Sequence, residues 1–162
     1  MKRLTVLVLT GTTLLGLAAP ALPQLGFAQT DPLPGGWQLN LAKSRFSPGP
    51  PLKSGSLYIH GDGQNRRDSI VTIDAQGNPA AGVFTHIYDG QPHPVTGLPA
   101  VDAAAYTRGD ANILNYRYMK AGSVVATGTF TVSQDGKTLT ISATGTNANG
   151  QSVNNIGVYD KQ

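Results

Sequence analysis

The stretch Val124–Gly145 constrains the fold most, because it predicts both a pair of strands and the register between them. Its dipeptide Asp135-Gly136 favours a two-residue type I′ turn, whose twist matches that of the strands it joins. Side chains alternate between the two faces of a strand, so counting outward from the turn defines an apolar face. The residues paired on that face are Val132 with Leu139, Phe130 with Ile141, and Gly128 with Ala143.

The same alternation predicts the neighbours of this hairpin. If Lys120–Gly122 is a three-residue loop, Tyr118 lies opposite Val124 and Tyr116 opposite Ala126. If Asn147–Gly150 is a four-residue loop, the last strand presents its apolar positions inward and turns Tyr159 outward. The pairs expected on the inner face are then Leu139 with Val158, Ile141 with Ile156, and Ala143 with Asn154.

Short segments of this kind recur along the rest of the chain, and glycine, asparagine or aspartate marks nearly every boundary between them. No segment after residue 28 shows an apolar pattern of helical period. We therefore expect an all-β antiparallel up-and-down meander of about nine or ten strands. Closure into a barrel removes the exposed edges of such a sheet, and a β-sandwich or an open roll is the alternative.

The N-terminus has the pattern of a secretory signal peptide. Lys2 and Arg3 precede the apolar run Leu4–Leu17, and small residues at Gly26-Phe27-Ala28 form a cleavage site. The expected organisation is a signal peptide over residues 1–28, a linker over 29–35 and a single β-barrel domain over 36–162. The apolar run is shorter than the roughly 20 residues of a membrane span, so we expect an exported protein, periplasmic or secreted, without stable membrane insertion.

Charge and cysteine content narrow the classes of partner. The chain has 12 Lys+Arg and 9 Asp+Glu, so removal of Lys2 and Arg3 leaves ten basic against nine acidic residues, a net charge of +1. That balance gives no basic footprint for nucleic acid or for an anionic membrane surface. The chain contains no cysteine, which excludes disulfides, and its stability must come from its core.

Two resemblances follow from particular runs. The Gly36-Trp37 pair on the first strand, the meander and the ending Val158–Lys161 resemble the lipocalin and fatty-acid-binding-protein superfamily, the calycins. The runs Leu39–Pro50 and Pro94–Pro99 are similar to those of small exported bacterial proteins of unassigned function. The first resemblance implies a closed, lipocalin-like barrel that holds a small apolar ligand. Its fatty-acid-binding members grip a carboxylate with a final Arg-x-Tyr, but Gly157 stands at the arginine position here.

The residues that carry chemistry form no recognisable catalytic motif. His60, His86 and His93 lack metal-ligand spacing and are interpreted as exposed, so no metal and no cofactor are expected. His86 and Asp89 could join a serine in a triad, but no nucleophile elbow is present. The pair Arg66-Arg67 is interpreted as a solvated loop pair. We therefore do not expect an enzyme.

The remaining hypotheses differ in what fills the barrel. In the first, small side chains on the inner face leave room for a small apolar or amphipathic ligand, which is the expected partner. In the alternative, the core is filled and the protein is a structural or protein-interaction module of the cell envelope. The candidate ligand-binding residues are Tyr116, Tyr118, Gly128, Phe130, Ile141, Ala143 and Asn154.

Overall fold

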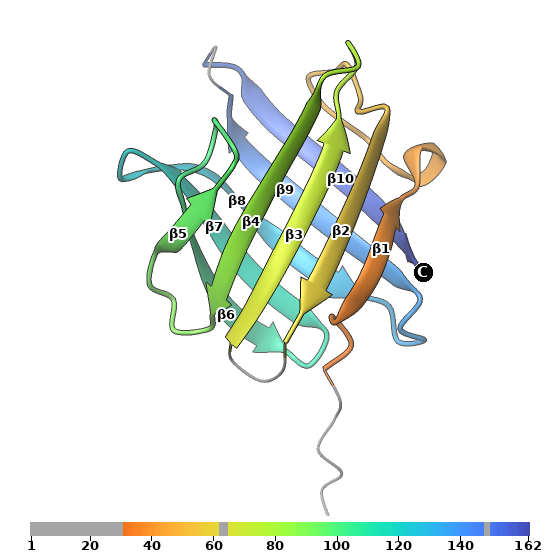
Figure 1. The fold of residues 1–162 in the computed structure, drawn as a ribbon, viewed down its shortest axis with the longest axis vertical. Helices are drawn as coiled ribbons and strands as arrows, with labels where there is room; N and C mark the ends of the chain where they lie inside the picture. The colour runs from red at the N-terminus through yellow and green to blue at the C-terminus, as the bar shows by residue number, and fades with distance from the viewer. Residues whose placement is uncertain (1–30, 62–64, 148–149) are drawn as a thin grey trace, which may run out of the picture.

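The computed structural model describes residues 31–61, 65–147 and 150–162. Its ten strands form one closed antiparallel barrel whose strand order follows the chain (Figure 1). The strands are β1 (Gly35–Leu39), β2 (Ser54–His60), β3 (Asn65–Ile73), β4 (Pro79–Ile87), β5 (His93–Thr96), β6 (Ala103–Asp110), β7 (Ile113–Lys120), β8 (Ser123–Val132), β9 (Thr138–Thr146) and β10 (Ser152–Lys161). The only helix among the described residues is the short 3₁₀ turn η1 (Leu41–Lys43).

This architecture confirms the predicted meander and its closure. Each strand pairs with its neighbours in the chain, and β1 closes the ring by pairing with β10. Closure removes the exposed sheet edges that a sandwich or an open roll would have to protect. Among the residues described, no helix is long and apolar enough to cross a membrane.

The register of the β8–β9 hairpin is confirmed, but its predicted turn type is wrong. Phe130 pairs with Ile141 and Gly128 with Ala143, as expected. A type I′ turn needs a positive φ at two successive residues, and here only Gly136 has one, at 70°. The Gly136 N–H donates to the Ser133 carbonyl (2.9 Å), and the Asp135 carboxylate accepts from the Ser133 hydroxyl (2.6 Å). This backbone bond and this side-chain bond favour a longer turn that leaves the strand register unchanged.

Substitution of Gly136 tests this turn. Gly136→Val should lower the free energy of unfolding by roughly 1–3 kcal/mol, because a β-branched residue is strained at positive φ. Gly136→Asn is the matched control, because asparagine tolerates that conformation, and it should cost clearly less. Urea denaturation measures both. Equal losses for the two variants would contradict the backbone explanation, since open space surrounds the Cβ position of Gly136.

The β7–β8 connection is shorter than predicted. Ala121 and Gly122 both have positive φ, at 49° and 78°, so the type I′ turn lies here. Lys120 pairs with Ser123, and a bulge near Tyr118 admits one extra residue. Tyr118 therefore lies opposite Ala126 and Tyr116 opposite Gly128, two residues from the predicted register. An even shift keeps both tyrosines on the predicted inner face.

The β9–β10 register differs from the prediction by one residue, and this reverses the faces of β10. Thr146 pairs with Ser152, because the connection extends to Gln151, whose N–H bonds to the Asn147 side chain (3.0 Å). Tyr159 then lies opposite Leu139 and is buried, whereas Asn154 lies opposite Thr144 on the outer face and is exposed. The predicted inner-face position of Asn154 and outward position of Tyr159 are therefore wrong.

The hydrophobic core lies inside the barrel. The N-terminal segment and the β6–β7 turn lie at the lower end of the barrel in Figure 1. Leu33 precedes the first strand yet is buried, and its carbonyl accepts a hydrogen bond from the Trp37 indole (2.9 Å). The buried apolar residues are Leu33, Trp37, Leu39, Leu57, Ile59, Phe84, Val95, Ala104, Tyr106, Leu114, Tyr116, Phe130, Val132, Leu139 and Tyr159.

Candidate functional site

A cluster of ionisable side chains lies inside the barrel. Alternation along β3 directs Arg66 and Asp68 to the inner face, and the register of β4 places His86 opposite Arg66. Their exposed fractions are 3% for Arg66, 2% for Asp68 and 1% for His86. Charged residues are rarely buried to this degree unless they are paired, so this cluster is the most unusual feature of the interior.

The pairing within the cluster is incomplete. The His86 ring stacks on Tyr106 with 3.6 Å between centroids, and its Nε2 lies 3.1 Å from Oδ2 of Asp68. That approach lacks the geometry of a hydrogen bond, and neither ring nitrogen has a partner among the described residues. Nε and Nη1 of Arg66 and Oδ1 of Asp68 also lack one within the described chain. Buried polar atoms without partners are rare, so each indicates strain or a molecule that would complete it.

Burial changes the protonation of the cluster. It raises the pKa of Asp68 to about 7, although the positive charge of Arg66 acts in the opposite direction. Burial, and then the charge of Arg66, lower the pKa of His86 to about 3. Burial likewise lowers the pKa of Arg66. At pH 6 the interior therefore holds a neutral imidazole beside a protonated carboxyl group, with the Arg66 guanidinium next to them.

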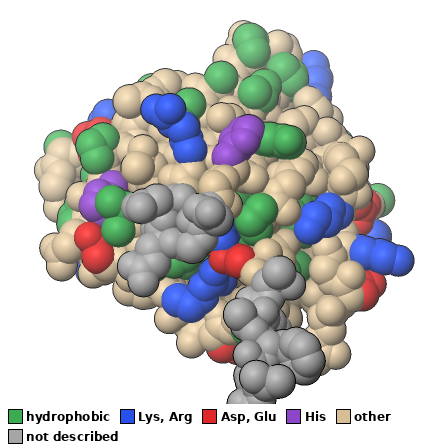
Figure 2. All heavy atoms as spheres, turned by 60° about the horizontal axis from the view of Figure 1, so that its bottom comes forward, with side chains coloured by type: hydrophobic (Ala, Val, Ile, Leu, Met, Phe, Trp, Pro, Cys, Tyr) green, Lys and Arg blue, Asp and Glu red, His purple; other side chains and the backbone are tan. Residues whose placement is uncertain are grey.

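The lower end of the barrel adds a second arginine and a carboxylate. Nη2 of Arg66 and Nη2 of Arg108, on β6, both contact Oδ2 of Asp31 in the N-terminal segment. The Tyr88 ring lies against both guanidinium groups, 5.4 Å from Cζ of Arg66 and 4.9 Å from Cζ of Arg108. Figure 2 shows this end of the molecule, where acidic and basic side chains lie close together at the surface. We call Asp31, Arg66, Tyr88 and Arg108 the arginine clamp.

The predicted inner-face residues form an aromatic wall above the cluster. Tyr116 and Phe130 are buried and meet edge to face, with 5.4 Å between ring centroids. Tyr118 lies 4.3 Å from the Tyr116 ring and 5.3 Å from the Phe84 ring. Ile141 lies opposite Phe130 and Ala143 opposite Gly128, and both are half-buried. The structure thus brings Tyr116, Tyr118, Phe130, Ile141 and Ala143 onto one surface.

Gly128 shares that face, but its surroundings leave no room for a side chain. A Cβ there would lie 1.8 Å from the Ser142 carbonyl oxygen and 2.7 Å from the Tyr116 hydroxyl. The Tyr116 hydroxyl donates to the same carbonyl at 2.7 Å. Gly128 therefore permits a close approach of β8 and β9 at a bend of the barrel. Its role is to let the two backbones and the tyrosine hydroxyl meet.

The sequence interpretation missed the polar cluster. Arg66 is a buried strand residue, whereas Arg67 beside it is exposed, so the prediction of a solvated pair is wrong for Arg66. The prediction that His86 is exposed is also wrong. Alternation with Phe84 on β4 was the available signal, because residues two apart share a face. The suggested partner Asp89 instead pairs with His93 at the surface (3.0 Å).

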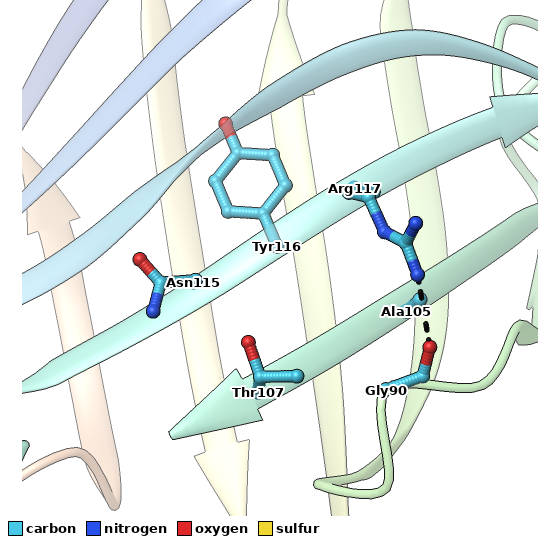
Figure 3. Close-up of a pocket in the computed structure, with 6 residues that line it drawn as sticks. All are labelled: Gly90, Ala105, Thr107, Asn115, Tyr116 and Arg117. Atoms are coloured by element: carbon cyan, nitrogen blue, oxygen red, sulfur yellow. Dashed lines mark hydrogen bonds between the residues drawn. The ribbon is translucent and has the colours of Figure 1, made fainter. Parts of the chain in front are cut away.

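A small surface pocket lies outside the barrel between β6, β7 and the β4–β5 connection (Figure 3). Its volume is about 160 Å³, and Arg117 closes one side by donating to the Gly90 carbonyl (3.0 Å). In Figure 3 the Tyr116 ring points away from the Arg117 side chain, toward the barrel interior. The pocket residues are Gly90, Ala105, Thr107, Asn115, Tyr116 and Arg117, a set that contains no acid, thiol or histidine.

Comparison with known proteins adds no family to this description. No protein-family model matches the chain, and no curated protein is significantly similar to it. The barrel and the contacts within it are therefore the basis for assigning a function.

Proposed function

We propose that this protein is exported, to the periplasm or beyond the cell, and binds a small apolar or amphipathic molecule inside its barrel. A calycin-like closed barrel is compatible with that role, because barrels of this type enclose ligand sites. The apolar part of the ligand would contact the aromatic wall at Tyr118, Ile141 and Ala143. Polar groups of the ligand would meet the tyrosine hydroxyls deeper in the barrel.

The observation that carries this proposal is the environment of Tyr118. Its ring lies among the inner-face aromatic residues, with 4.3 Å between the Tyr118 and Tyr116 centroids and 5.3 Å between those of Tyr118 and Phe84. The residue nevertheless keeps accessible surface, and its place opposite Ala126 directs it inward. Tyr118 thus combines an inner-face position with accessible surface, the combination that a side chain lining a ligand site inside the barrel would have. Ile141 and Ala143 on the same inner face are half-buried in the same way.

The alternative, a structural or interaction module, needs a filled interior and an exposed apolar patch. The large exposed hydrophobic side chains of the described residues are Leu41, Tyr58, Val71 and Val124. Of these residues, only Tyr58 and Val71 lie on strands that pair with each other, β2 and β3, so the four do not form one patch. Ligand binding is accordingly the function that the geometry supports better.

Binding of a neutral fluorescent probe tests the proposal. Protein purified from expression of the full chain should enhance the fluorescence of N-phenyl-1-naphthylamine. Ala143→Phe should weaken that binding at least about tenfold, a change of about 1.4 kcal/mol, because the added ring occupies the interior beside Ile141. Thr144→Phe is the matched control, since Thr144 is the next residue along β9 and is exposed on the outer face. It should leave the affinity unchanged.

Two results would decide against ligand binding. The wild-type protein would bind no probe, and Ala143→Phe would lower the free energy of unfolding by about 1–3 kcal/mol through overpacking. That combination would show that the interior is filled, and it would favour the structural alternative.

A further inference from the structure

The arginine clamp holds an internal carboxylate in the manner of a bound anion. Oδ2 of Asp31 is contacted by both Arg66 and Arg108, which come from strands β3 and β6. Among the described residues, Oδ1 of Asp31 accepts one local hydrogen bond, from the Leu33 N–H at 3.1 Å. Two guanidinium groups that converge on one oxygen form a site that binds carboxylate or phosphate through charge-assisted hydrogen bonds.

The charges of the clamp are not balanced by Asp31 alone. Two guanidinium groups face a single carboxylate, and Tyr88, which lies against both, is a neutral phenol. Asp68 is the other carboxyl group near Arg66, and burial raises its pKa to about 7, so it supplies less than a full negative charge at neutral pH. A net positive charge therefore remains at the inner end of the clamp.

Arg66 also keeps unused hydrogen-bond donors. Its side chain is 1% exposed, and Nε and Nη1 have no partner among the residues described. A buried donor without a partner costs free energy, which an ordered water or a ligand acceptor would recover. A second anion, or a larger one in place of Asp31, would supply the missing acceptors. Arg66 is therefore the clamp residue that points most directly to a ligand.

The clamp is reachable from the lower end of the barrel. The Asp31 and Arg108 side chains are 21% and 28% exposed, in contrast to Arg66. Asp31 also lines an open cavity of about 620 Å³, together with Asn112, Lys161 and the turn at residues 133–136. Lys161 adds a positive charge on that side, and Asp135 adds a negative one. A free anion can therefore approach the position that the Asp31 carboxylate occupies.

From these observations we propose that the arginine clamp is an anion-binding site, occupied here by Asp31 as an internal ligand. The external ligand would be an amphipathic molecule that ends in a carboxylate or phosphate group, with the anionic group joining or displacing Asp31. The amphipathic part rests on the proposed function, whereas the anion site itself does not. Arg66 would bind the anion from inside the barrel and Arg108 from its rim.

Chemical rescue tests the anion site without any amphipathic ligand. Asp31→Ala leaves both guanidinium groups without this carboxylate and should lower the melting temperature. Sodium acetate should then raise the melting temperature of the variant at least about 3 °C more than sodium chloride of equal ionic strength. The wild-type protein, whose clamp already holds the Asp31 carboxylate, should show a smaller difference. Parallel measurements with inorganic phosphate determine whether the site prefers carboxylate or phosphate.

Asp102→Ala is the matched control, because Asp102 lies beside exposed Lys120 (3.8 Å) and is not part of the clamp. It should show no acetate-specific stabilisation. If Asp31→Ala does not fold, Asp31→Asn removes the charge and keeps the side-chain size, and it should be rescued in the same way. Absence of acetate-specific or phosphate-specific stabilisation in a folded Asp31 variant would overturn the anion site.

A matched pair of amphiphiles tests the ligand class. In displacement of N-phenyl-1-naphthylamine from the wild-type protein, decanoate should show an affinity at least about fivefold higher than that of decanol. Arg108→Gln should remove that preference without lowering the affinity for decanol. Equal displacement by the two, with no rescue of Asp31→Ala, would overturn the anionic ligand and leave the proposed function standing. Rescue by acetate without any probe binding would retain the anion site and overturn the proposed function.

Discussion

Phe130→Ala is expected to lower the free energy of unfolding by about 3–5 kcal/mol, because it removes a buried ring and leaves a cavity. Phe130 is buried, and its ring contacts Tyr116 edge to face and lies 6.5 Å from the centroids of Tyr106 and His86. Its loss therefore removes packing both from the aromatic wall and from His86 in the polar cluster. Urea denaturation followed by tryptophan fluorescence measures the change.

Thr131→Ala is the control for this prediction. Thr131 is the next residue along β8, pairs with Thr140 and is directed to the outer face. Its replacement should cost less than about 1 kcal/mol, the range of strand propensity at a position away from the core. A larger loss for Thr131→Ala than for Phe130→Ala would mean that the inner and outer faces of β8 are reversed.

His86→Gln is expected to change how the free energy of unfolding depends on pH. The pKa of His86 is lowered in the folded state, so its contribution to stability is present above the unfolded value of 6.5 and is lost as the pH falls toward 3. The variant lacks this contribution. Between about pH 4 and about pH 6.5, the stability lost on substitution should therefore grow with pH by about 3 kcal/mol.

Asp68→Asn should have the opposite pH dependence. The pKa of Asp68 is raised in the folded state to about 7, so its contribution is fully present below the unfolded value of 3.8 and is lost as the pH rises through 7. The asparagine variant does not undergo that loss. Relative to wild type, its stability should improve by about 3 kcal/mol between about pH 4 and about pH 7.

These opposite slopes separate a neutral pair from an ion pair. In folded wild type the neutral pair binds one proton, on Asp68, and in the unfolded chain the two side chains also bind one proton, on His86, between pH 4 and 6.5. The pH dependences of the two residues therefore cancel in the stability of wild type. An ionised pair in the barrel would make His86→Gln lose no additional stability between those pH values. Denaturant titrations of wild type and the two variants at four pH values distinguish the two cases.

Local patterns in the chain were enough to predict the barrel and one of its registers. The β8–β9 register was predicted correctly because side-chain alternation and a short connection agree, even though the turn type at Asp135-Gly136 was wrong. A turn with two more residues in the loop preserves both the pairing and the face. The same reasoning placed Tyr116, Tyr118 and Phe130 on the inner face.

The register of β10 depends on the length of the loop before it, which side-chain alternation does not predict. Ile156 and Val158 are more apolar than Gly157, so the pattern favoured them for the inner face. The connection at residues 147–151 sets the actual pairing and directs Tyr159 inward. Tyr159 fills the interior beside Gly157, where a Cβ would lie 3.0 Å from its ring. One residue of loop length thus decided which face of the last strand is buried.

The polar cluster shows most clearly what tertiary structure adds. Alternation assigns Arg66, Asp68 and His86 to strand faces, but hydrophobicity alone assigns charged residues to solvent. Arg66 is buried beside Asp31 from before β1, which Arg108 on β6 also contacts, and His86 is buried against Tyr106 on β6. The free energy of a buried charge is set by its neighbours in space. The strands and the barrel therefore follow from local order in the chain, whereas the arginine clamp exists only once the barrel has closed.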